Sequence, residues 1–345
     1  MENRNITLFC LLFAGVVLFL VFNQTTDGSK PLFVFQTHQC QSSTKSNTIG
    51  PGDGLESALS EASMANKTVI IAIVNKAYVE GDKPMLDMFL DGFWLGEDTR
   101  GLISHLLLVA VDQTSFERCK FLRLHCYKLE ADGADFEAEE LYMSQDFIKM
   151  MWRRTLFLKE MLKRGYSFVF TDIDVMWLRN HFPKLIIFNE SIDLQISTDS
   201  FNGDQLSVAN PINTGFYMVT SNNRTISLFE KWHAQKNYST KLKEQDVLNG
   251  MMKEGVFREL GLSVRFLDTR YFSGFCEVSR DFKAVTTVHA NCCRTIGAKV
   301  VDLTAVVHDW KRFKSLSNSN STSTLKWTNH EACNRSWKCN KVTWG

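Results

Sequence analysis

Residues 168–180 read FVFTDIDVMWLRN, and this stretch decides the fold that we expect. The apolar run FVF predicts a buried strand, and two carboxylates, Asp172 and Asp174, follow directly after it. Side chains at positions i and i+2 of an extended chain point the same way, so both carboxylates can address one ligand. Oxygen ligands at a strand end suit a hard cation such as Mn²⁺ or Mg²⁺. A solvated or helix-capping loop is the alternative, but the apolar residues on both sides favour a functional site.

Outward from this stretch, apolar runs alternate with amphipathic segments. We expect strands at 69–74, 106–111, 168–170, 192–197, 216–220, 264–268 and 286–289, and helices at 53–64, 84–95, 144–164, 225–235 and 245–260. Fully apolar strands that alternate with helices predict an α/β domain with a mostly parallel central sheet flanked by helices. Ligands of such sheets bind outside the carboxyl ends of the strands. Polar residues directly after a strand are therefore candidate ligand-binding residues, and two more of them are Asn75 and Asp112.

An uncharged apolar run, ITLFCLLFAGVVLFLVF, occupies residues 6–22. At 1.5 Å per residue a helix over this run would span roughly 25 Å, enough for a thin bilayer. Arg4 precedes the run and no basic residue follows it directly, which predicts a cytosolic tail at 1–5, a transmembrane signal anchor at 6–22 and a luminal body. A cleaved signal peptide is the alternative, but the length of the run and the lack of a small-residue cleavage motif favour the anchor.

Glycosylation acceptors and cysteines also indicate a luminal body. Beyond residue 22, Asn-x-Ser/Thr occurs at Asn23, Asn66, Asn189, Asn223, Asn237, Asn320 and Asn334. Eight cysteines also lie there, at Cys40, Cys119, Cys126, Cys276, Cys292, Cys293, Cys333 and Cys339. An even number suits disulfides in an oxidising compartment, although the sequence leaves their pairing open. The sequence contains no CxxC pair, so it gives no indication of a structural zinc site.

The composition is that of an ordinary globular protein. Of 345 residues, 44% are hydrophobic and 22% are charged, and 39 basic residues against 38 acidic ones give a net charge of +1. This balance argues against a nucleic-acid partner. Residues 23–50 are rich in Ser, Thr and Gln and predict a flexible stem. We expect one domain over 51–314, followed by a low-complexity stretch and a Trp/Cys-rich tail over 315–345.

Six motifs follow one another between about residues 66 and 312. They are VNKAYVE (74–80), HLLLVAVDQTSFERC (105–119), WRRTLFLKEMLKRGYSFVFTDIDVMWLRN (152–180), NTGFYMV (213–219), EQDVLN (244–249) and HANCC (289–293). Together they resemble the plant nucleotide-diphospho-sugar transferase family, which groups with retaining glycosyltransferases of the GT-A fold and is similar to glycosyltransferase family 77. The resemblance implies a GT-A-like single domain in a type II Golgi membrane enzyme. Such an enzyme moves arabinose, xylose or galactose from a UDP-sugar to a glycan or glycoprotein acceptor.

The resemblance also implies a metal centre. Asp172 and Asp174 would hold Mn²⁺ or Mg²⁺, which neutralises the charge of the departing diphosphate. His289 follows a late expected strand and would be the third ligand. A core histidine beside a disulfide is an equal alternative for this residue. Lys299 lies a few residues on, where a related family keeps a lysine near the diphosphate, although the spacing here is longer.

Other candidate residues would bind the donor and the acceptor. Asn75 would contact the uridine part, with Asp112 as a further donor-binding candidate. Arg154 would pair with phosphate, unless it belongs to a solvated helix face. Asn213 lies in a motif that surrounds the sugar in the family, and Gln195 and Asp246 would donate to or accept from sugar hydroxyls. Asp246 equally fits a plain acidic residue in the first turn of a helix.

Two alternative functions remain open at this point. The stretch FVFTDIDV also resembles the DxDx(T/V) strand of haloacid-dehalogenase phosphatases, in which the first Asp is the nucleophile. That motif normally opens its domain, whereas two expected strands precede it here. A catalytically inactive luminal binding or scaffold protein on the same fold is the second alternative, because a fold does not imply an activity.

Overall fold

The computed structural model describes residues 53–129, 143–185, 192–238, 242–316 and 325–337. The tail, anchor and stem expected over residues 1–50 lie outside these ranges. Within the ranges, no helix combines the length and the apolar character needed to cross a membrane.

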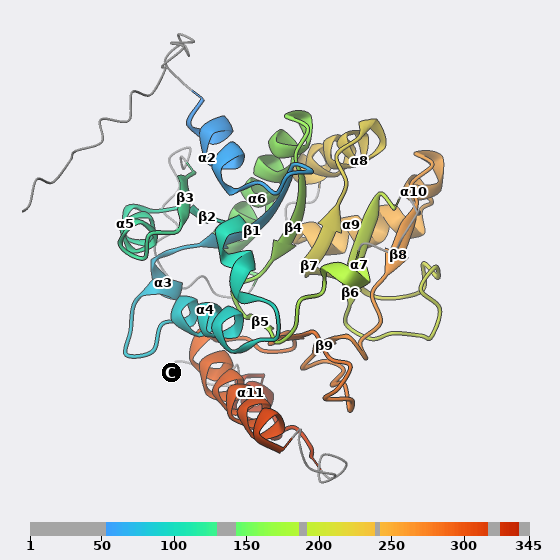
Figure 1. Cartoon of the computed structure of the whole chain (residues 1–345). Helices are drawn as coiled ribbons and strands as arrows, with labels where there is room; N and C mark the ends of the chain where they lie inside the picture. The colour runs from blue at the N-terminus through green and yellow to red at the C-terminus, as the bar shows by residue number, and fades with distance from the viewer. Residues whose placement is uncertain (1–52, 130–142, 186–191, 239–241, 317–324, 338–345) are drawn as a thin grey trace, which may run out of the picture. The chain divides into compact units, whose positions relative to one another are not determined.

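The centre of the domain is a mixed sheet with the strand order β3-β2-β1-β4-β7-β6-β8 (Figure 1). Its strands are β1 (Thr68–Val74), β2 (Leu106–Ala110), β3 (His125–Lys128), β4 (Ser167–Thr171), β6 (Leu194–Thr198), β7 (Ile212–Val219) and β8 (Val264–Phe266). Neighbouring strands pair in parallel except at β7, which is antiparallel to both β4 and β6. The α/β class and the mostly parallel sheet expected from the apolar runs are therefore observed, with one reversed strand.

A second, three-stranded sheet lies directly after the DxD stretch. It is formed by β5 (Val175–Trp177), β9 (Phe272–Gly274) and β10 (Thr287–His289), in the order β5-β10-β9. The backbone N–H of Val175 donates to the carbonyl of Asp172 in the turn between β4 and β5. In the antiparallel pair of β10 with β5, His289 is the register partner of Val175. The two carboxylates thus lie at the junction of the two sheets, beside the end of β10.

Helices cover both faces of the central sheet. The helices are α2 (Gly54–Ala62), α3 (Lys76–Val79), α4 (Met85–Leu95), α5 (Gln113–Phe121), α6 (Gln145–Lys163), α7 (Phe182–Leu185), α8 (Asn223–Ala234), α9 (Glu244–Lys253), α10 (Val256–Glu259), α11 (Ile296–Leu316) and α12 (Glu331–Ser336), with 3₁₀ turns η1 (Arg100–His105) and η2 (Gln235–Asn237). Side chains of β1 alternate between two cores, because successive residues of a strand face opposite sides. One core contains residues of α2, α6, α8 and α9, and the other contains residues of α4 and α11.

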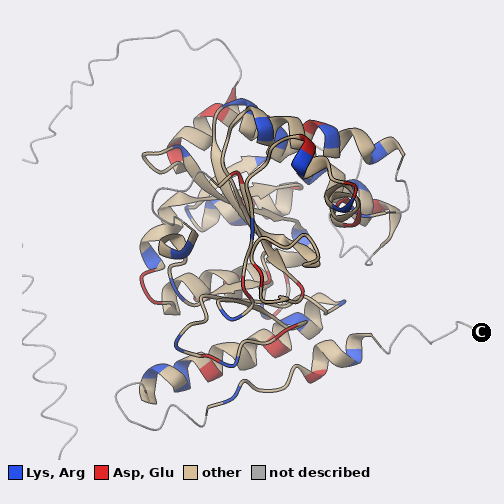
Figure 2. Cartoon of the chain, turned by 90° about the vertical axis from the view of Figure 1, so that its right-hand side faces the viewer, with Lys and Arg blue, Asp and Glu red and all other residues tan. Residues whose placement is uncertain are grey.

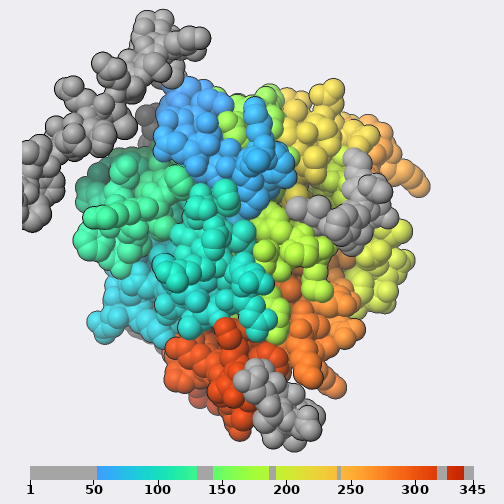
Figure 3. Space-filling model, viewed as in Figure 1, coloured from blue at the N-terminus to red at the C-terminus, as the bar shows by residue number. Residues whose placement is uncertain are grey.

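Two helical segments differ from the expectation. The single helix expected over 245–260 is divided into α9 and α10, because Gly255 has a φ of 90° and interrupts the helical path. The long helix α11 has no counterpart among the expected elements. Its valines at 300, 301, 306 and 307 have stiff β-branched side chains that favour strands, so its sequence hides the helix. Packing against α4 accompanies the helical form, and the atoms of α11 (orange-red) lie directly against the blue-green part of the molecule in Figure 3. The indole N–H of Trp310 donates to the carbonyl of Leu95.

The chain after α11 also belongs to the folded body. The boundary expected at residue 314 falls inside α11, and α12 is tied to the domain by the Cys293–Cys333 disulfide. Two further disulfides join Cys119 to Cys126 and Cys276 to Cys292. The pairing that the sequence left open is settled for these six cysteines, whereas Cys40 and Cys339 lie outside the described residues. Both signs of charge occur on the helices visible in Figure 2, as the near-zero net charge leads one to expect.

Candidate active site

A cavity of about 290 Å³ opens where the sequence predicted a ligand site. Its walls are formed by the carboxyl ends of β1, β4 and β10, the first residues of β7 and the first turns of α9 and α11. Because β7 runs antiparallel to β4, its beginning lies at the same edge of the sheet as the end of β4. Segments that are far apart in the chain therefore contribute side chains to one cavity.

Three side chains with metal-binding atoms converge in the cavity. Asp172, Asp174 and His289 each offer an oxygen or nitrogen atom within 4.8 Å of the others. The Nε2 atom of His289 lies 3.3 Å from Oδ1 of Asp174 and 3.9 Å from Oδ2 of Asp172. Two carboxylates and one imidazole are a donor set that suits Mn²⁺ or Mg²⁺. The trio is thus a possible Asp-X-Asp-His metal site.

The close approach of these groups requires a glycine at position 215. A Cβ atom at Gly215 would overlap the ring of His289 and would lie 2.7 Å from Oδ2 of Asp172. The backbone N–H of Gly215 donates to Oδ1 of Asn213 at 2.8 Å, which fixes the strand at this point. The space that a side chain would fill is occupied by the metal-binding groups themselves.

The buried Arg154 and the largely buried Lys299 neutralise the two aspartates. Nζ of Lys299 lies 2.7 Å from Oδ2 of Asp174, and Nη1 of Arg154 lies 3.0 Å from Oδ1 of Asp172. Arg154 also pairs with Glu244, whose side chain is almost completely buried. Arg154 comes from α6, Lys299 from α11 and Glu244 from α9, so three helices deliver charge to the end of β4.

These contacts shift the pKa values of the two aspartates in opposite directions. Burial by itself would raise the pKa of Asp174, but Lys299 and His289 outweigh burial and hold that pKa far below its usual range. Burial is also the largest influence on Asp172, and together with the negative charge of Asp174 it raises the pKa of Asp172 despite Arg154. Burial would lower the pKa of His289, but the charge of Asp174 outweighs this effect and raises it. Asp174 is therefore the more strongly ionised carboxylate.

Part of the cavity wall is rich in side-chain oxygens and amides. The hydroxyl of Thr214 donates to Oε1 of Glu244 at 2.8 Å, and the backbone N–H of Thr214 donates to Oε1 of Gln245 at 3.0 Å. Oδ1 of Asp199 accepts from Nδ2 of Asn213 at 2.8 Å and from Nδ2 of Asn291 at 2.9 Å. Such a wall can exchange hydrogen bonds with the hydroxyls of a sugar.

Seven of the ten residues singled out from the sequence line this cavity. They are Asn75, Arg154, Asp172, Asp174, Asn213, His289 and Lys299. The side chain of Asn75 is buried at the end of β1, where the main chain turns into α3. These residues come from β1, α6, the turn after β4, β7, β10 and α11, and the fold brings them together.

The other three residues do not line the cavity. Asp112 caps α5: its Oδ1 accepts from the N–H of Ser115 at 2.7 Å, and its Oδ2 accepts from the N–H of Lys76 at 2.6 Å. Both oxygens thus hold the main chain. Gln195 is buried in β6, where its Nε2 donates to the carbonyl of Leu185 at 2.7 Å. Asp246 is exposed in the first turn of α9, as the plain helical alternative implies.

Several cavity residues escaped the sequence analysis. They are Asp199, Glu244, Asn291, Arg294 and Trp337, whereas Thr214 and Gln245, which also line the cavity, lie at positions that the family resemblance places around the sugar and the acceptor. Glu244 and Gln245 belong to the same EQDVLN motif as Asp246, but successive helical residues are turned by about 100° and only the first two face the cavity. Knowing where α9 begins would have identified Glu244. Trp337 follows α12 and reaches the cavity only through the tertiary fold.

Comparisons with known proteins agree on one family. A model of the nucleotide-diphospho-sugar transferase family matches residues 101–303, more than half of the chain. The uncharacterized Arabidopsis thaliana protein At1g28695 is 53% identical over 312 residues, 89% of this chain and 91% of that protein. At4g15970, also an uncharacterized protein of A. thaliana, is 37% identical over 280 residues, 81% of this chain and 73% of that protein. The A. thaliana beta-arabinofuranosyltransferase RAY1 is 26% identical over 234 residues, 63% of this chain and 41% of that protein. The chain therefore belongs to the nucleotide-diphospho-sugar transferase family and is a glycosyltransferase by this membership.

Proposed function

We propose that this glycosyltransferase is active and metal-dependent, and that it moves a sugar of the arabinose, xylose or galactose class from a UDP-sugar to a glycan or glycoprotein. The observation that carries the proposal is the convergence of Asp172, Asp174 and His289 in the cavity at the strand ends. Family membership sets aside the phosphatase alternative. The 26% sequence identity to the beta-arabinofuranosyltransferase RAY1 supports a pentose donor.

In this proposal each part of the cavity has its own task. A bound divalent cation supplies Lewis-acid stabilisation of the departing diphosphate. Asp172, Asp174 and His289 would hold it, while Arg154 keeps Asp172 oriented and Lys299 keeps Asp174 ionised. Asn75 stands at the end of β1, where the nucleoside would enter.

The sugar would lie against the wall of oxygens and amides. Glu244 and Asp199 already accept hydrogen bonds from neighbouring protein groups, so their positions are set before a ligand arrives. Preorganised acceptors of this kind orient a sugar ring at little entropic cost. Which hydroxyls they meet would distinguish arabinofuranose from xylose and galactose.

We further propose that the domain is luminal and anchored in the Golgi membrane by residues 6–22. Four glycosylation acceptors fall within the described residues, at Asn66, Asn223, Asn237 and Asn334, and all four are exposed. The three disulfides fit an oxidising compartment. Treatment of the expressed protein with an endoglycosidase should increase its mobility, and protease outside sealed microsomes should spare the body. A mature N-terminus near Asn23 would contradict the anchor.

The test of activity is the release of UDP from candidate donors. Full-length protein is incubated with UDP-arabinofuranose, UDP-xylose or UDP-galactose, with Mn²⁺ or with a chelator, beside the Asp172→Asn variant. Mn²⁺-dependent release by the wild type, absent in the variant, supports the proposal. Mn²⁺-dependent binding of UDP without turnover of any donor would instead support a binding protein on the same fold.

A further inference from the structure

Arg294 is a positively charged residue of the cavity wall. Its guanidinium forms no ion pair with the described residues, and its buried Nε has no hydrogen-bond partner among them. Arg154 and Lys299 line the same cavity, but both are already paired with carboxylates. A buried hydrogen-bond donor without a partner raises the free energy of the folded protein. A ligand that accepts hydrogen bonds from this guanidinium would remove that cost.

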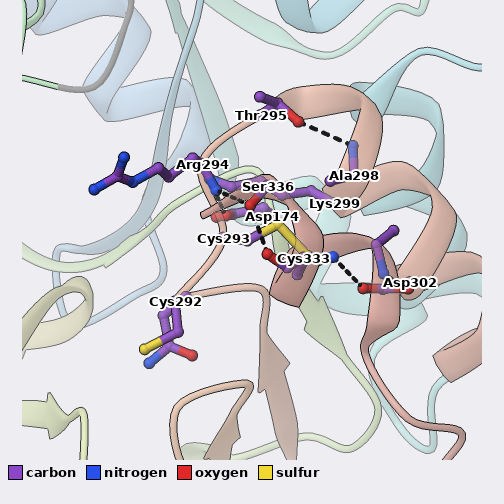
Figure 4. The surroundings of a disulfide bond; sticks show 12 residues. Asp174, Cys292, Cys293, Arg294, Thr295, Ala298, Lys299, Asp302, Cys333 and Ser336 are labelled. Atoms are coloured by element: carbon purple, nitrogen blue, oxygen red, sulfur yellow. Dashed lines mark hydrogen bonds and ion pairs between the residues drawn. A yellow bond between two sulfur atoms is a disulfide. The ribbon is translucent and has the colours of Figure 1, made fainter. Parts of the chain in front are cut away.

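The position of Arg294 is set by the chain that follows α11. Cζ of Arg294 lies 4.1 Å from the centre of the Trp337 ring, within the range of a cation–π contact. The indole N–H of Trp337 donates to the carbonyl of Cys292 at 2.7 Å, which holds the ring in place. The backbone N–H of Arg294 donates to the hydroxyl of Ser336 at 3.1 Å. The Arg294 side chain extends away from the disulfide and from the first turn of α11 (Figure 4).

Residues 325–337 are themselves firmly attached to the domain. Cys333 forms a disulfide with Cys293, the residue before Arg294. Oδ2 of Asp302, in α11, accepts from the backbone N–H of Cys333 at 2.8 Å (Figure 4). The ring of His330 stacks on Phe275 with 3.6 Å between the ring centres. A segment fastened at these points can hold Trp337 against Arg294.

The charge of the cavity indicates the chemistry of the ligand. Among the described residues that line the cavity, the number of acidic side chains equals the number of Lys and Arg side chains. The acidic residues are Asp172, Asp174, Asp199 and Glu244, and the basic residues are Arg154, Lys243, Arg294 and Lys299. A divalent cation on the metal trio would add two positive charges, which would match the two negative charges of a nucleotide-sugar diphosphate. A planar guanidinium can donate two parallel hydrogen bonds to phosphate oxygens, whereas a lysine acts as a point charge.

We propose that Arg294 binds the diphosphate of the nucleotide-sugar donor, and that Trp337 is the positioning residue that holds the guanidinium in place. This inference rests on the proposed function and assigns the diphosphate contact to a residue outside the DxD stretch. It also gives residues 325–337 a part in donor binding. The Cys293–Cys333 disulfide then supports the site, since it ties the arginine's neighbour to the segment that carries Trp337.

The experiment measures the binding of UDP and of uridine to the full-length chain in Mn²⁺ by calorimetry. Arg294→Gln should weaken UDP binding on the order of ten- to a hundredfold, the size of a lost charge-assisted hydrogen bond, and should leave uridine binding unchanged. Arg294→Lys should restore part of the loss. Trp337→Leu keeps the charge but removes the ring, and should weaken UDP binding by a smaller factor. Arg335→Gln is the matched control, because this exposed arginine of α12 does not line the cavity and should bind UDP as the wild type does.

Each outcome decides between the two proposals. Equal UDP affinity in the wild type and Arg294→Gln overturns the inference but leaves the proposed function intact. Equal weakening of UDP and uridine binding also overturns it, because that result indicates general damage to the cavity. A wild type that binds no UDP in Mn²⁺ contradicts the proposed function and the inference with it. If Arg294→Gln does not fold, the Arg294→Lys and Trp337→Leu variants decide by the same comparison of UDP with uridine.

Discussion

Gly215 lies so close to His289 that a side chain at position 215 would overlap the imidazole ring. Gly215 belongs to β7 of the central sheet, and His289 ends β10 of the small sheet. The contact between them joins the two sheets beside Asp172. The metal trio therefore depends on a residue that carries no metal-binding atom.

Adding a methyl group at position 215 tests whether the metal trio requires a glycine there. Gly215→Ala should weaken Mn²⁺ binding and lower transfer, because the new Cβ would push apart His289 and the carboxylate of Asp172. Gly250→Ala is the control: Gly250 lies in α9 with nothing near its Cβ position, and alanine there should stabilise the helix by about 0.5–1 kcal/mol. Calorimetric titration with Mn²⁺ measures the first effect and thermal melting the second. Unchanged Mn²⁺ affinity in Gly215→Ala would show that the site tolerates the methyl group.

The two aspartates should respond differently to substitution. Asp172→Asn and Asp174→Asn should both abolish Mn²⁺-dependent transfer, since each removes one metal ligand. Asp174→Asn should also lower the free energy of unfolding by about 3 kcal/mol, because it leaves the largely buried Lys299 without its carboxylate. In Asp172→Asn, Arg154 retains its ion pair with Glu244. The free energy of unfolding of that variant should therefore fall by less than about 1 kcal/mol. Urea denaturation without metal measures the difference, and equal losses would contradict this reading of the Lys299 contact.

His289 offers a test that separates metal binding from packing. His289→Ala should raise the Mn²⁺ concentration needed for half-maximal UDP release roughly ten- to a hundredfold, with only a small change in melting temperature. A purely structural histidine predicts the reverse, namely a clear fall in melting temperature with the same Mn²⁺ requirement. Titrating Mn²⁺ against activity beside a melting curve for both proteins distinguishes the two.

His181 should make the fold sensitive to mild acid. Its ring is buried among Trp177, Phe216 and Phe272, and burial lowers its pKa to about 3. In the unfolded chain the pKa of this histidine is about 6.5. Between that pH and the lower pKa of the folded state, the imidazole binds a proton in the unfolded chain but not in the folded protein. This single group should therefore cost about 2 kcal/mol of stability between pH 7.5 and pH 5.

The measurement for His181 compares the change in the free energy of unfolding between two pH values in two proteins. Urea unfolding of the wild type and of His181→Phe is compared at pH 7.5 and at pH 5, so that the other titrating groups cancel. The variant should lose about 2 kcal/mol less than the wild type over this interval. Equal losses in both proteins would mean that His181 is not the source of the acid sensitivity.

Much of the candidate site could be predicted because its signals are local. The apolar run before Asp172 and Asp174 identifies both the strand and the ligands at its end, and a short β-branched run identifies His289 in the same way. The prediction failed where it depended on the direction or the local contacts of a single side chain. Asp246 shares its motif with Glu244, yet two residues along a helix turn the side chain to the opposite side. Asp112 has the expected position after a strand, but the backbone of α5 takes up its carboxylate.

The sequence by itself determined the α/β class, most of the strands, the DxD pair and the family, because these depend on patterns within a few residues of the chain. Only the tertiary structure decided that Lys299 meets Asp174, that Gly215 must make room for His289, and that Cys293 pairs with Cys333. Each of these contacts joins residues from separate elements, many positions apart in the chain. Such pairs carry no local signature, because their proximity follows from how the helices and the two sheets pack together.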